Sequence, residues 1–267
     1  MTGMRFKLVL MTTALVLAGC SSSGDDRAPR ANEKPAGDEN TVAEPGEISA
    51  YESQTKTAPT GVARFADLAH GVTTKKSTLE IRRRPKPSSR ARGLAMTNPI
   101  DQRLVLLIHH VRSTENGDWL EVYLPERPNG STAWVRRKDV RVVKLRHRIE
   151  VDLSKTTLKH FRNNQLIRRF KVGVGEDRYP TPKGVFYVWA KVPQPSPAGP
   201  YGNYALGISG FSPVLSDWPG GGRAAVHGTA VPGDKGQKVS HGCVRVFNDD
   251  MKKLTGVPMG TPVVIKR

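Results

Sequence analysis

The apolar residues of this chain come in short runs separated by turn-forming residues, and this pattern limits the folds that the chain can adopt. The runs hold about four to eight residues, which is the usual length of a β-strand. Gly, Pro, Asn and Asp lie between them, and the 267 residues include 26 Gly and 20 Pro. Such punctuation is typical of strands joined by turns. The sequence therefore predicts a mainly β protein.

The longest apolar run lies near the amino terminus and predicts export. About ten apolar residues follow Arg5 and Lys7 and lead to residues 17–20, LAGC. A bilayer span needs roughly twenty such residues, whereas a basic start, a short apolar core and small residues are typical of a secretory signal. Because LAGC resembles the bacterial lipobox, we expect residues 1–19 to be removed and Cys20 to be lipidated. An ordinary signal peptide with a chance cysteine, or a buried helix, is the alternative.

The formal net charge of +18 is unevenly distributed along the chain. Residues 20–72 carry a net charge of −4 and lack an apolar period, so we expect a flexible tether. Residues 73–148 hold 18 Lys/Arg against 7 Asp/Glu, and residues 149–267 hold 17 against 8. Export makes nucleic acid a poor partner and favours anionic lipids or wall polyanions. The basic loop 82–86 either binds such a polyanion or is only a solvated face.

Residues 73–148 show the spacing of a small β-barrel. The apolar run 104–108 predicts a buried strand, and the Asn-Gly pair at 116–117 predicts a turn. The segments GDWLEV (117–122) and GSTAWV (130–135) resemble the bacterial Src-homology-3-like barrel that is common in wall proteins.

Residues 149–267 continue as short strands, and one short helix is expected near the end. Asn248 or Asp249 can cap a helix that runs to Leu254, and Gly256 can close it.

Two motifs in this region carry the chemistry. They are HGT at 227–229 and SHGCVR at 240–245. An exported cysteine without a structural partner suggests reactivity, and a thiolate nucleophile needs a nearby base. His227 and His241 are both available for that role. Glycines beside Cys243 leave backbone N–H groups free to hold an oxyanion.

Taken alone, these residues leave two other interpretations open. A single cysteine is often a buried small hydrophobic residue, although the polar, Gly-rich flanks of Cys243 argue against burial. Two His and one Cys could also bind zinc, but no fourth ligand lies at a usual spacing. Neither His109 nor His110 has a metal-binding pattern around it.

The two motifs closely resemble the catalytic signature of the L,D-transpeptidases in residues and in spacing. The resemblance extends to TPKG at 181–184, to much of 199–212 and to GTPVVI at 260–265, and thus covers roughly 149–267. It implies a β-rich catalytic fold, here preceded by the Src-homology-3-like barrel, with the short helix placed after the catalytic cysteine.

The resemblance also implies roles for single residues. Cys243 would be the nucleophile and His227 the general base, oriented by the backbone carbonyl of Gly228. Backbone N–H groups at Gly242 and Cys243 would form the oxyanion hole. Further residues would shape the loop (Ser240, His241, Gly242) or contact substrate (Arg245, Tyr201, Tyr204).

The activity implied is acyl transfer on peptidoglycan. A thioester formed at the third stem residue, with release of D-alanine, would be resolved by an amine of a neighbouring stem to give a 3→3 cross-link. The resemblance also implies that no metal and no organic cofactor is required, and that carbapenems would acylate the same cysteine. The alternatives are a D,L-carboxypeptidase, attachment of protein to the wall, and a catalytically inactive wall-binding lipoprotein.

Overall fold

The computed structural model describes residues 41–42, 68–217 and 220–267. The predicted signal segment, Cys20 and most of the expected tether lie outside the described residues. The last residues of the expected tether, 69–72, lie in strand β2 (Ala69–Thr73), in which all five residues are buried. In the part of the chain that is described, no helix is long and apolar enough to cross a membrane.

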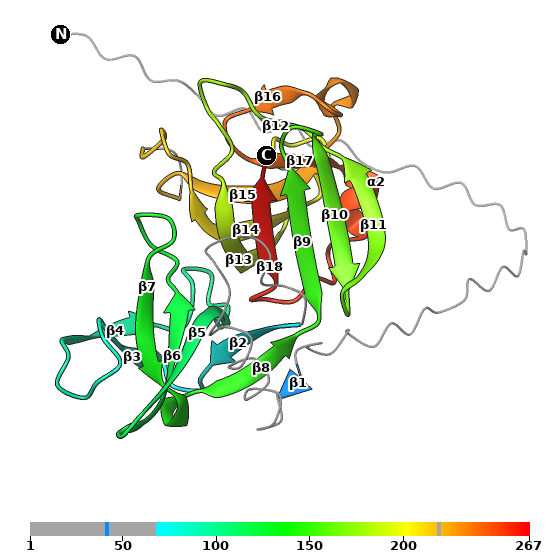
Figure 1. The fold of residues 1–267 in the computed structure, drawn as a ribbon. Helices are drawn as coiled ribbons and strands as arrows, with labels where there is room; N and C mark the ends of the chain where they lie inside the picture. Colours follow the sequence, from blue (N-terminus) through cyan, green and yellow to red (C-terminus); the bar gives the residue numbers. More distant parts are fainter. Residues whose placement is uncertain (1–40, 43–67, 218–219) are drawn as a thin grey trace, which may run out of the picture. The chain divides into compact units, whose positions relative to one another are not determined.

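The first sheet is antiparallel and has the strand order β1-β8-β2-β5-β6-β7-β3-β4 (Figure 1). Alternation of exposed and buried residues along β3 is typical of a strand with one face on the core. A likeness to the Src-homology-3 barrel stays a prediction. The elements are β1 (Thr41–Val42), β2 (Ala69–Thr73), β3 (Thr78–Arg82), β4 (Ala91–Ala95), β5 (Leu106–Thr114), β6 (Gly117–Tyr123), β7 (Thr132–Arg136), the 3-10 turn η2 (Arg137–Asp139) and β8 (Arg141–Leu145).

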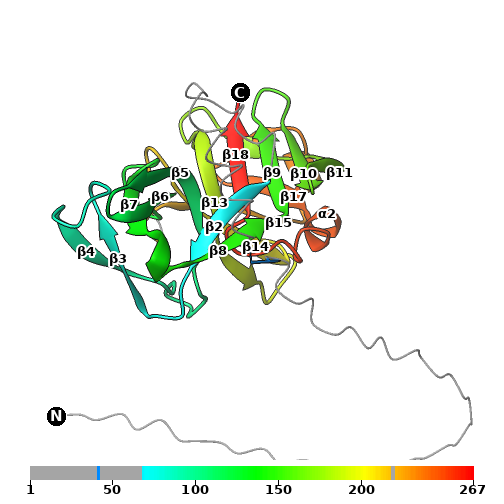
Figure 2. The same ribbon diagram turned by 60° about the horizontal axis from the view of Figure 1, so that its bottom comes forward.

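The second sheet begins at His147 and has the order β11-β10-β9-β18-β13-β14-β15-β17 (Figures 1 and 2). Most neighbours are antiparallel, but β9–β18 and β15–β17 are parallel pairs. Strands β12 and β16 form a small separate parallel pair. The elements are β9 (His147–Asp152), β10 (Thr157–Arg162), β11 (Gln165–Lys171), β12 (Val174–Gly175), β13 (Gly184–Pro193), β14 (Tyr204–Phe211), β15 (Arg223–Thr229), η3 (Pro232–Asp234), β16 (Lys238–Ser240), β17 (Val244–Phe247), α2 (Asn248–Lys252) and β18 (Pro262–Lys266).

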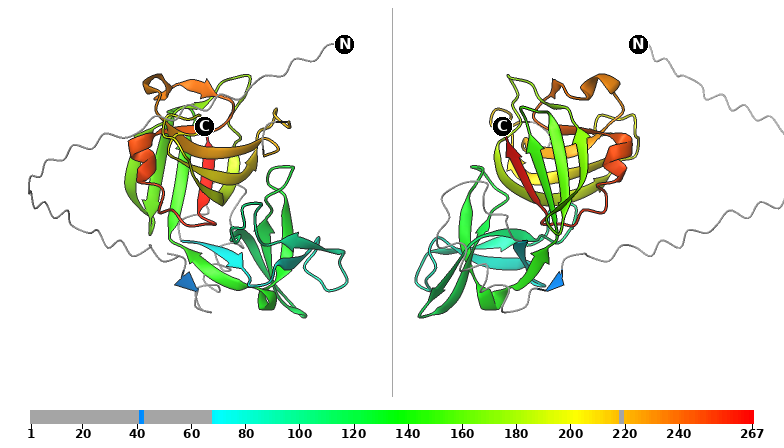
Figure 3. Two further views of the ribbon diagram at one scale, coloured as in Figure 1. Left: turned by 180° about the vertical axis from the view of Figure 1, so that it is seen from behind. Right: turned by 45° about the vertical axis from the view of Figure 1, so that its right-hand side comes forward.

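The predicted mainly β class is confirmed, with one short α-helix among the described residues. That helix, α2, follows β17 directly and flanks the second sheet (Figure 3). The predicted cap is wrong. Phe247 is the N-cap, and Asn248 lies inside the helix, where its side chain accepts from the Asn203 N–H at 3.0 Å and donates to the Pro197 carbonyl at 2.8 Å. Asn248 therefore ties α2 to the preceding loop.

The two sheets contact each other through polar side chains and one shared core. Gln102 donates to the Lys191 carbonyl at 2.7 Å and accepts from the Lys191 N–H at 2.9 Å. Tyr187, from β13, is completely buried in the apolar cluster of the first sheet. The second sheet has its own core, built around Ile149, Val226 and Val246 among others.

Candidate active site

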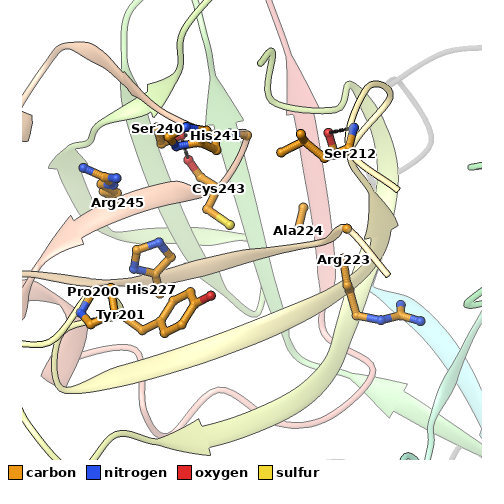
Figure 4. A pocket seen from close by; sticks show the side chains of 13 residues that line it. Pro200, Tyr201, Ser212, Arg223, Ala224, His227, Ser240, His241, Cys243 and Arg245 are labelled. Carbon is orange, nitrogen blue, oxygen red and sulfur yellow. Dashed lines mark hydrogen bonds between the residues drawn. The ribbon is translucent and has the colours of Figure 1, made fainter. Parts of the chain in front are cut away.

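The parallel pair β15–β17 brings the two predicted motifs together. His227 lies directly opposite Arg245 in this pairing. Cys243, two residues before Arg245, comes immediately before β17. Figure 4 shows the Cys243 sulfur pointing into the space beside His227 and Tyr201. Two motifs that are separated in sequence thus share one pocket.

A backbone carbonyl fixes the orientation of the His227 ring. The side chain is only 3% exposed, and its Nδ1 lies 2.8 Å from the Gly228 carbonyl oxygen. Because a carbonyl can only accept, Nδ1 must carry the proton and Nε2 is left with the lone pair. The contact predicted between His227 and Gly228 is present, while its part in catalysis stays a prediction.

Position 228 has no room for a side chain. A Cβ there would lie 2.4 Å from the Asn248 Oδ1 and 2.9 Å from the Asn203 backbone nitrogen. These two groups are themselves hydrogen-bonded at 3.0 Å. Glycine at 228 therefore lets the chain pass close to α2. It thereby fixes the position of the carbonyl that orients the His227 ring.

Burial keeps both reacting groups neutral in the resting site. It lowers the pKa of His227 to about 4, against the smaller opposing effect of the Gly228 carbonyl. It also raises the pKa of the Cys243 thiol, although the Ala225 backbone and the Arg245 charge act in the other direction. At neutral pH the site therefore holds a thiol and a neutral imidazole rather than a preformed ion pair.

The loop before Cys243 is a tight turn closed by Ser240. The Ser240 hydroxyl donates to the Cys243 carbonyl at 2.5 Å and accepts from the Gly242 N–H at 3.2 Å. Gly242 has φ = +111°, a conformation that side chains disfavour. Strand β16 ends at Ser240, so no regular strand places His241 on the face of Cys243. His241 is exposed and lies against Tyr179, with ring centroids 4.6 Å apart.

The three residues expected to contact substrate lie in different surroundings. Tyr201 meets the His227 ring edge-on at 5.2 Å and lines the pocket. Arg245 also lines it, but its guanidinium forms an ion pair with Asp234 at 3.1 Å. Tyr204 packs against the core of the second sheet and is not among the residues that line the pocket.

Asp234 is a part of the site that sequence reasoning missed. It is 4% exposed and accepts from the Thr229 hydroxyl at 2.5 Å as well as from Arg245. It thereby links the end of β15 to β17. The Pro-Gly-Asp turn that carries it gives no spacing signal, so only the fold reveals this carboxylate.

The pocket is small and combines predicted with unpredicted residues. Its volume is about 90 Å³. A cavity of this size accepts the reacting end of a chain rather than a whole drug-sized ligand, which needs roughly 300 Å³ or more. The predicted lining residues are Tyr201, His227, Ser240, His241, Gly242, Cys243 and Arg245, and the others are Pro200, Ser212, Leu215, Gly222, Arg223 and Ala224.

Comparisons with known proteins found relatives of one part of this chain. Residues 146–265 match the model of the YkuD family, described as the L,D-transpeptidase catalytic domain. YkuD of Bacillus licheniformis, whose name gives it as a provisional L,D-transpeptidase, is 34% identical over 120 residues, or 45% of this chain and 65% of that protein. ErfK/SrfK of Escherichia coli, whose name also gives it as a provisional L,D-transpeptidase, is 30% identical over 161 residues. This match covers 54% of this chain and 51% of that protein.

One solved structure is similar to part of this chain. The catalytic domain of the E. faecium L,D-transpeptidase is 28% identical and has a TM-score of 0.36, with 45% of this chain and 96% of that chain covered. Residues 146–265 thus resemble the L,D-transpeptidase catalytic domain in sequence. The chain as a whole spans about half to two thirds of the curated relatives that it matches.

Proposed function

We propose that this protein is a peptidoglycan L,D-transpeptidase that forms 3→3 cross-links through a thioester on Cys243. The observation that carries the proposal is one pocket that holds both the Cys243 sulfur and a His227 ring whose Nδ1–H is tied to Gly228. Thiol acyl transfer requires a nucleophile beside a base that a third group orients. The family match of this domain supports peptidoglycan as the substrate.

The first half-reaction follows from this geometry. Nε2 of His227 takes the thiol proton while the sulfur attacks the carbonyl carbon of the third stem residue. The Cys243 N–H would hold the oxyanion that forms, and the Gly242 N–H would join it by giving up its 3.2 Å bond to the Ser240 hydroxyl. The amide bond to the terminal D-alanine then breaks, and the leaving amine takes the proton from His227. The thioester remains on Cys243.

The second half-reaction regenerates the thiol. A side-chain amine on the third residue of a neighbouring stem attacks the thioester carbon. Its proton passes to His227 and from there to the departing sulfur, so that a new amide bond replaces the thioester. The small pocket would hold the reacting groups, and the remaining stem and glycan would lie outside it.

We further propose that the protein works outside the cytoplasm as a lipoprotein anchored through Cys20. The LAGC segment after a short apolar core supports the anchor, and a cell-wall enzyme family supports the location. Several acyl chains on one cysteine would hold the protein stably, whereas one chain binds only marginally.

Product analysis separates this function from its rivals. The purified protein is incubated with a disaccharide tetrapeptide, and the products are read by mass spectrometry. Dimers formed with release of D-alanine are expected, and Cys243→Ala should form none while keeping the circular dichroism spectrum of the wild type. Tripeptide without dimers would instead show a carboxypeptidase. Stems joined only to an added protein amine would show wall attachment, and no turnover at all would show a binding module.

A further inference from the structure

The first sheet reaches across to the wall of the Cys243 pocket through the loop between β6 and β7. Three catalytic-domain carbonyls accept from the single guanidinium of Arg127, namely those of Ser212 and Leu215 at 2.9 Å and of Gly221 at 3.1 Å. Ser212 and Leu215 both line the pocket. We define the rim as residues 212–217 and 220–222, which follow β14 and precede β15.

Asn129 on the same loop fixes the strand that leads into the rim. Its Oδ1 accepts from the Phe211 N–H at 2.9 Å, and its Nδ2 donates to the Phe211 carbonyl at 2.8 Å. The amide thus takes the place of a neighbouring strand at the end of β14. Arg223, at the start of β15, donates in return to the Pro125 carbonyl at 3.1 Å.

The conformation of the rim depends on these contacts. Gly222 has φ = +72°, and the space beside its Cα is filled by the Leu215 carbonyl and by Arg127 Nη2. The Ser212 N–H donates to the Gly222 carbonyl at 2.7 Å, which closes the base of the rim. Carbonyls gathered on one side repel each other unless a cation lies among them, and Arg127 supplies that charge.

We propose that Arg127 and Asn129 are positioning residues, through which the first sheet holds the substrate wall of the Cys243 pocket. The inference rests on the proposed function for its kinetic consequence, but the positioning itself can be measured independently. Neither residue touches the Cys243 thiol or the His227 ring in the contacts described, so they act through the rim.

Hydrogen exchange and kinetics together test this proposal. Arg127→Ala should speed amide exchange in peptides that cover the rim and should lower kcat/KM for the tetrapeptide about tenfold, with Arg127→Lys between it and the wild type. Alkylation of Cys243 by iodoacetamide should stay unchanged, because the thiol and imidazole are untouched. The matched control is Arg103→Ala, which removes a guanidinium that holds the Thr74 and Lys76 carbonyls within the first sheet.

Two results would overturn the positioning role. One is rim exchange that is the same in Arg127→Ala as in the wild type. The other is faster rim exchange with unchanged kcat/KM. If the wild type itself fails to turn over the tetrapeptide, the proposed function fails, and the exchange measurement still decides whether Arg127 holds the rim.

A separate observation, on strands β5 and β6, carries a second inference. Neighbouring residues of a regular strand point to opposite faces, but the register of β5 against β6 shifts between Ile108 and His110. His109 and His110 consequently lie together, with ring centroids 4.0 Å apart. Glu121 lies opposite His110, and one of its oxygens is 3.0 Å from His110 Nδ1.

These three side chains lie close enough together to hold a metal ion. One ligand atom from each lies within 4.8 Å of the others, and all three residues are half-buried. In a tetrahedral zinc site with bonds of about 2.1 Å, ligand atoms are about 3.4 Å apart, so small side-chain rotations would suffice. The second Glu121 oxygen accepts from the Thr132 hydroxyl at 2.7 Å, as an outer partner of a metal ligand does.

We propose that His109, His110 and Glu121 bind a divalent transition metal such as Zn²⁺, with a position left open for solvent. The sequence-based prediction found no partner pattern near the two histidines, because the β-bulge and the cross-strand carboxylate cannot be read from spacing along the chain. The site is distinct from the Cys243 pocket and is not needed for the thioester chemistry.

Zinc titration by calorimetry tests the second proposal. The full chain carrying Cys20→Ser and Cys243→Ser is used, so that no thiol competes, and it should bind one Zn²⁺. Glu121→Gln and Thr132→Val should each weaken binding about tenfold or more. Asp118→Asn is the matched control, since Asp118 is an exposed carboxylate on β6 that pairs with Ser113. No zinc binding, or binding unaffected by Glu121→Gln, would leave only an imidazole–carboxylate hydrogen bond and overturn the proposal.

Discussion

Cys243 and His227 lie together in a pocket that disfavours charge on either of them. Burial raises the pKa of the thiol and lowers that of the imidazole to about 4. Proton transfer from sulfur to Nε2 is therefore uphill in the resting protein. It becomes favourable only when substrate supplies an electrophilic carbonyl and the oxyanion site stabilises the charge that develops.

The pH dependence of alkylation tests this view of the resting thiol. A free cysteine, with a pKa near 8.5, is about 3% thiolate at pH 7. Because burial raises the pKa of Cys243, its thiolate fraction must be smaller, and iodoacetamide should react more slowly than with free cysteine at pH 7. The rate should keep rising above pH 8.5. The modified peptides, separated by mass spectrometry, distinguish Cys243 from Cys20. A rate that is already constant from pH 6 upward would show a preformed thiolate–imidazolium pair instead.

Single residues differ in how far the sequence alone predicts them. Cys243, His227 and Gly228 could be found because their motifs fix local geometry, a glycine turn beside a thiol and a carbonyl beside an imidazole. Asp234 and Arg127 could not, because each reaches the site through tertiary contacts that leave no periodicity in the sequence. The resemblance implied a substrate contact for Tyr204 as for Tyr201, yet Tyr204 packs against the core of the second sheet.

At the scale of secondary-structure elements, the site depends on how closely β15 approaches α2. Gly228→Ala should place a methyl group against Asn248 and Asn203, displace the carbonyl that orients His227, and lower kcat/KM about 100-fold. Overpacking should also cost about 1–3 kcal/mol of the free energy of unfolding. Product release measures the change in kcat/KM, and thermal unfolding measures the loss of stability.

Gly256→Ala is the matched control for this substitution. A Cβ at 256 would meet nothing within 4 Å, so the same chemical change should leave both activity and stability near the wild-type values. Full activity in Gly228→Ala would contradict the orienting role given to the carbonyl. The sequence predicted short strands in this region but placed neither β15 nor β17. The predicted cap of α2 was wrong, since the Asn248 side chain bonds to a loop instead of the helix end.

At the scale of the whole molecule, the second sheet depends on the first for part of its burial. Tyr187 is fully buried in the core of the first sheet, and Trp189 and Val185 pack against the same cluster. The mainly β class and the succession of two β-rich regions could be predicted from short apolar runs. The shared core could not be predicted from the sequence, because Tyr187 lies in β13, a strand of the second sheet, and nothing in the sequence indicates its contact with the first.

Truncation to residues 146–267 tests this dependence. Exposure of Tyr187 alone should lower the free energy of unfolding by about 3 kcal/mol, and the loss of the contacts to the rim should lower activity further. Urea unfolding of the truncated and full chains, with the same product assay, measures both effects. Equal stability and equal activity in the two chains would show that the catalytic domain is independent of the first sheet.

The most direct measurement of the central claim is the mass of the protein during turnover. After brief incubation with the tetrapeptide stem and rapid acid quenching, intact-protein mass spectrometry should show an added disaccharide tripeptide, with D-alanine in solution. Peptide mapping should place the adduct on Cys243, and Cys243→Ala should carry none. Release of D-alanine with no covalent adduct, or an adduct that persists in Cys243→Ala, would contradict thioester catalysis by this residue.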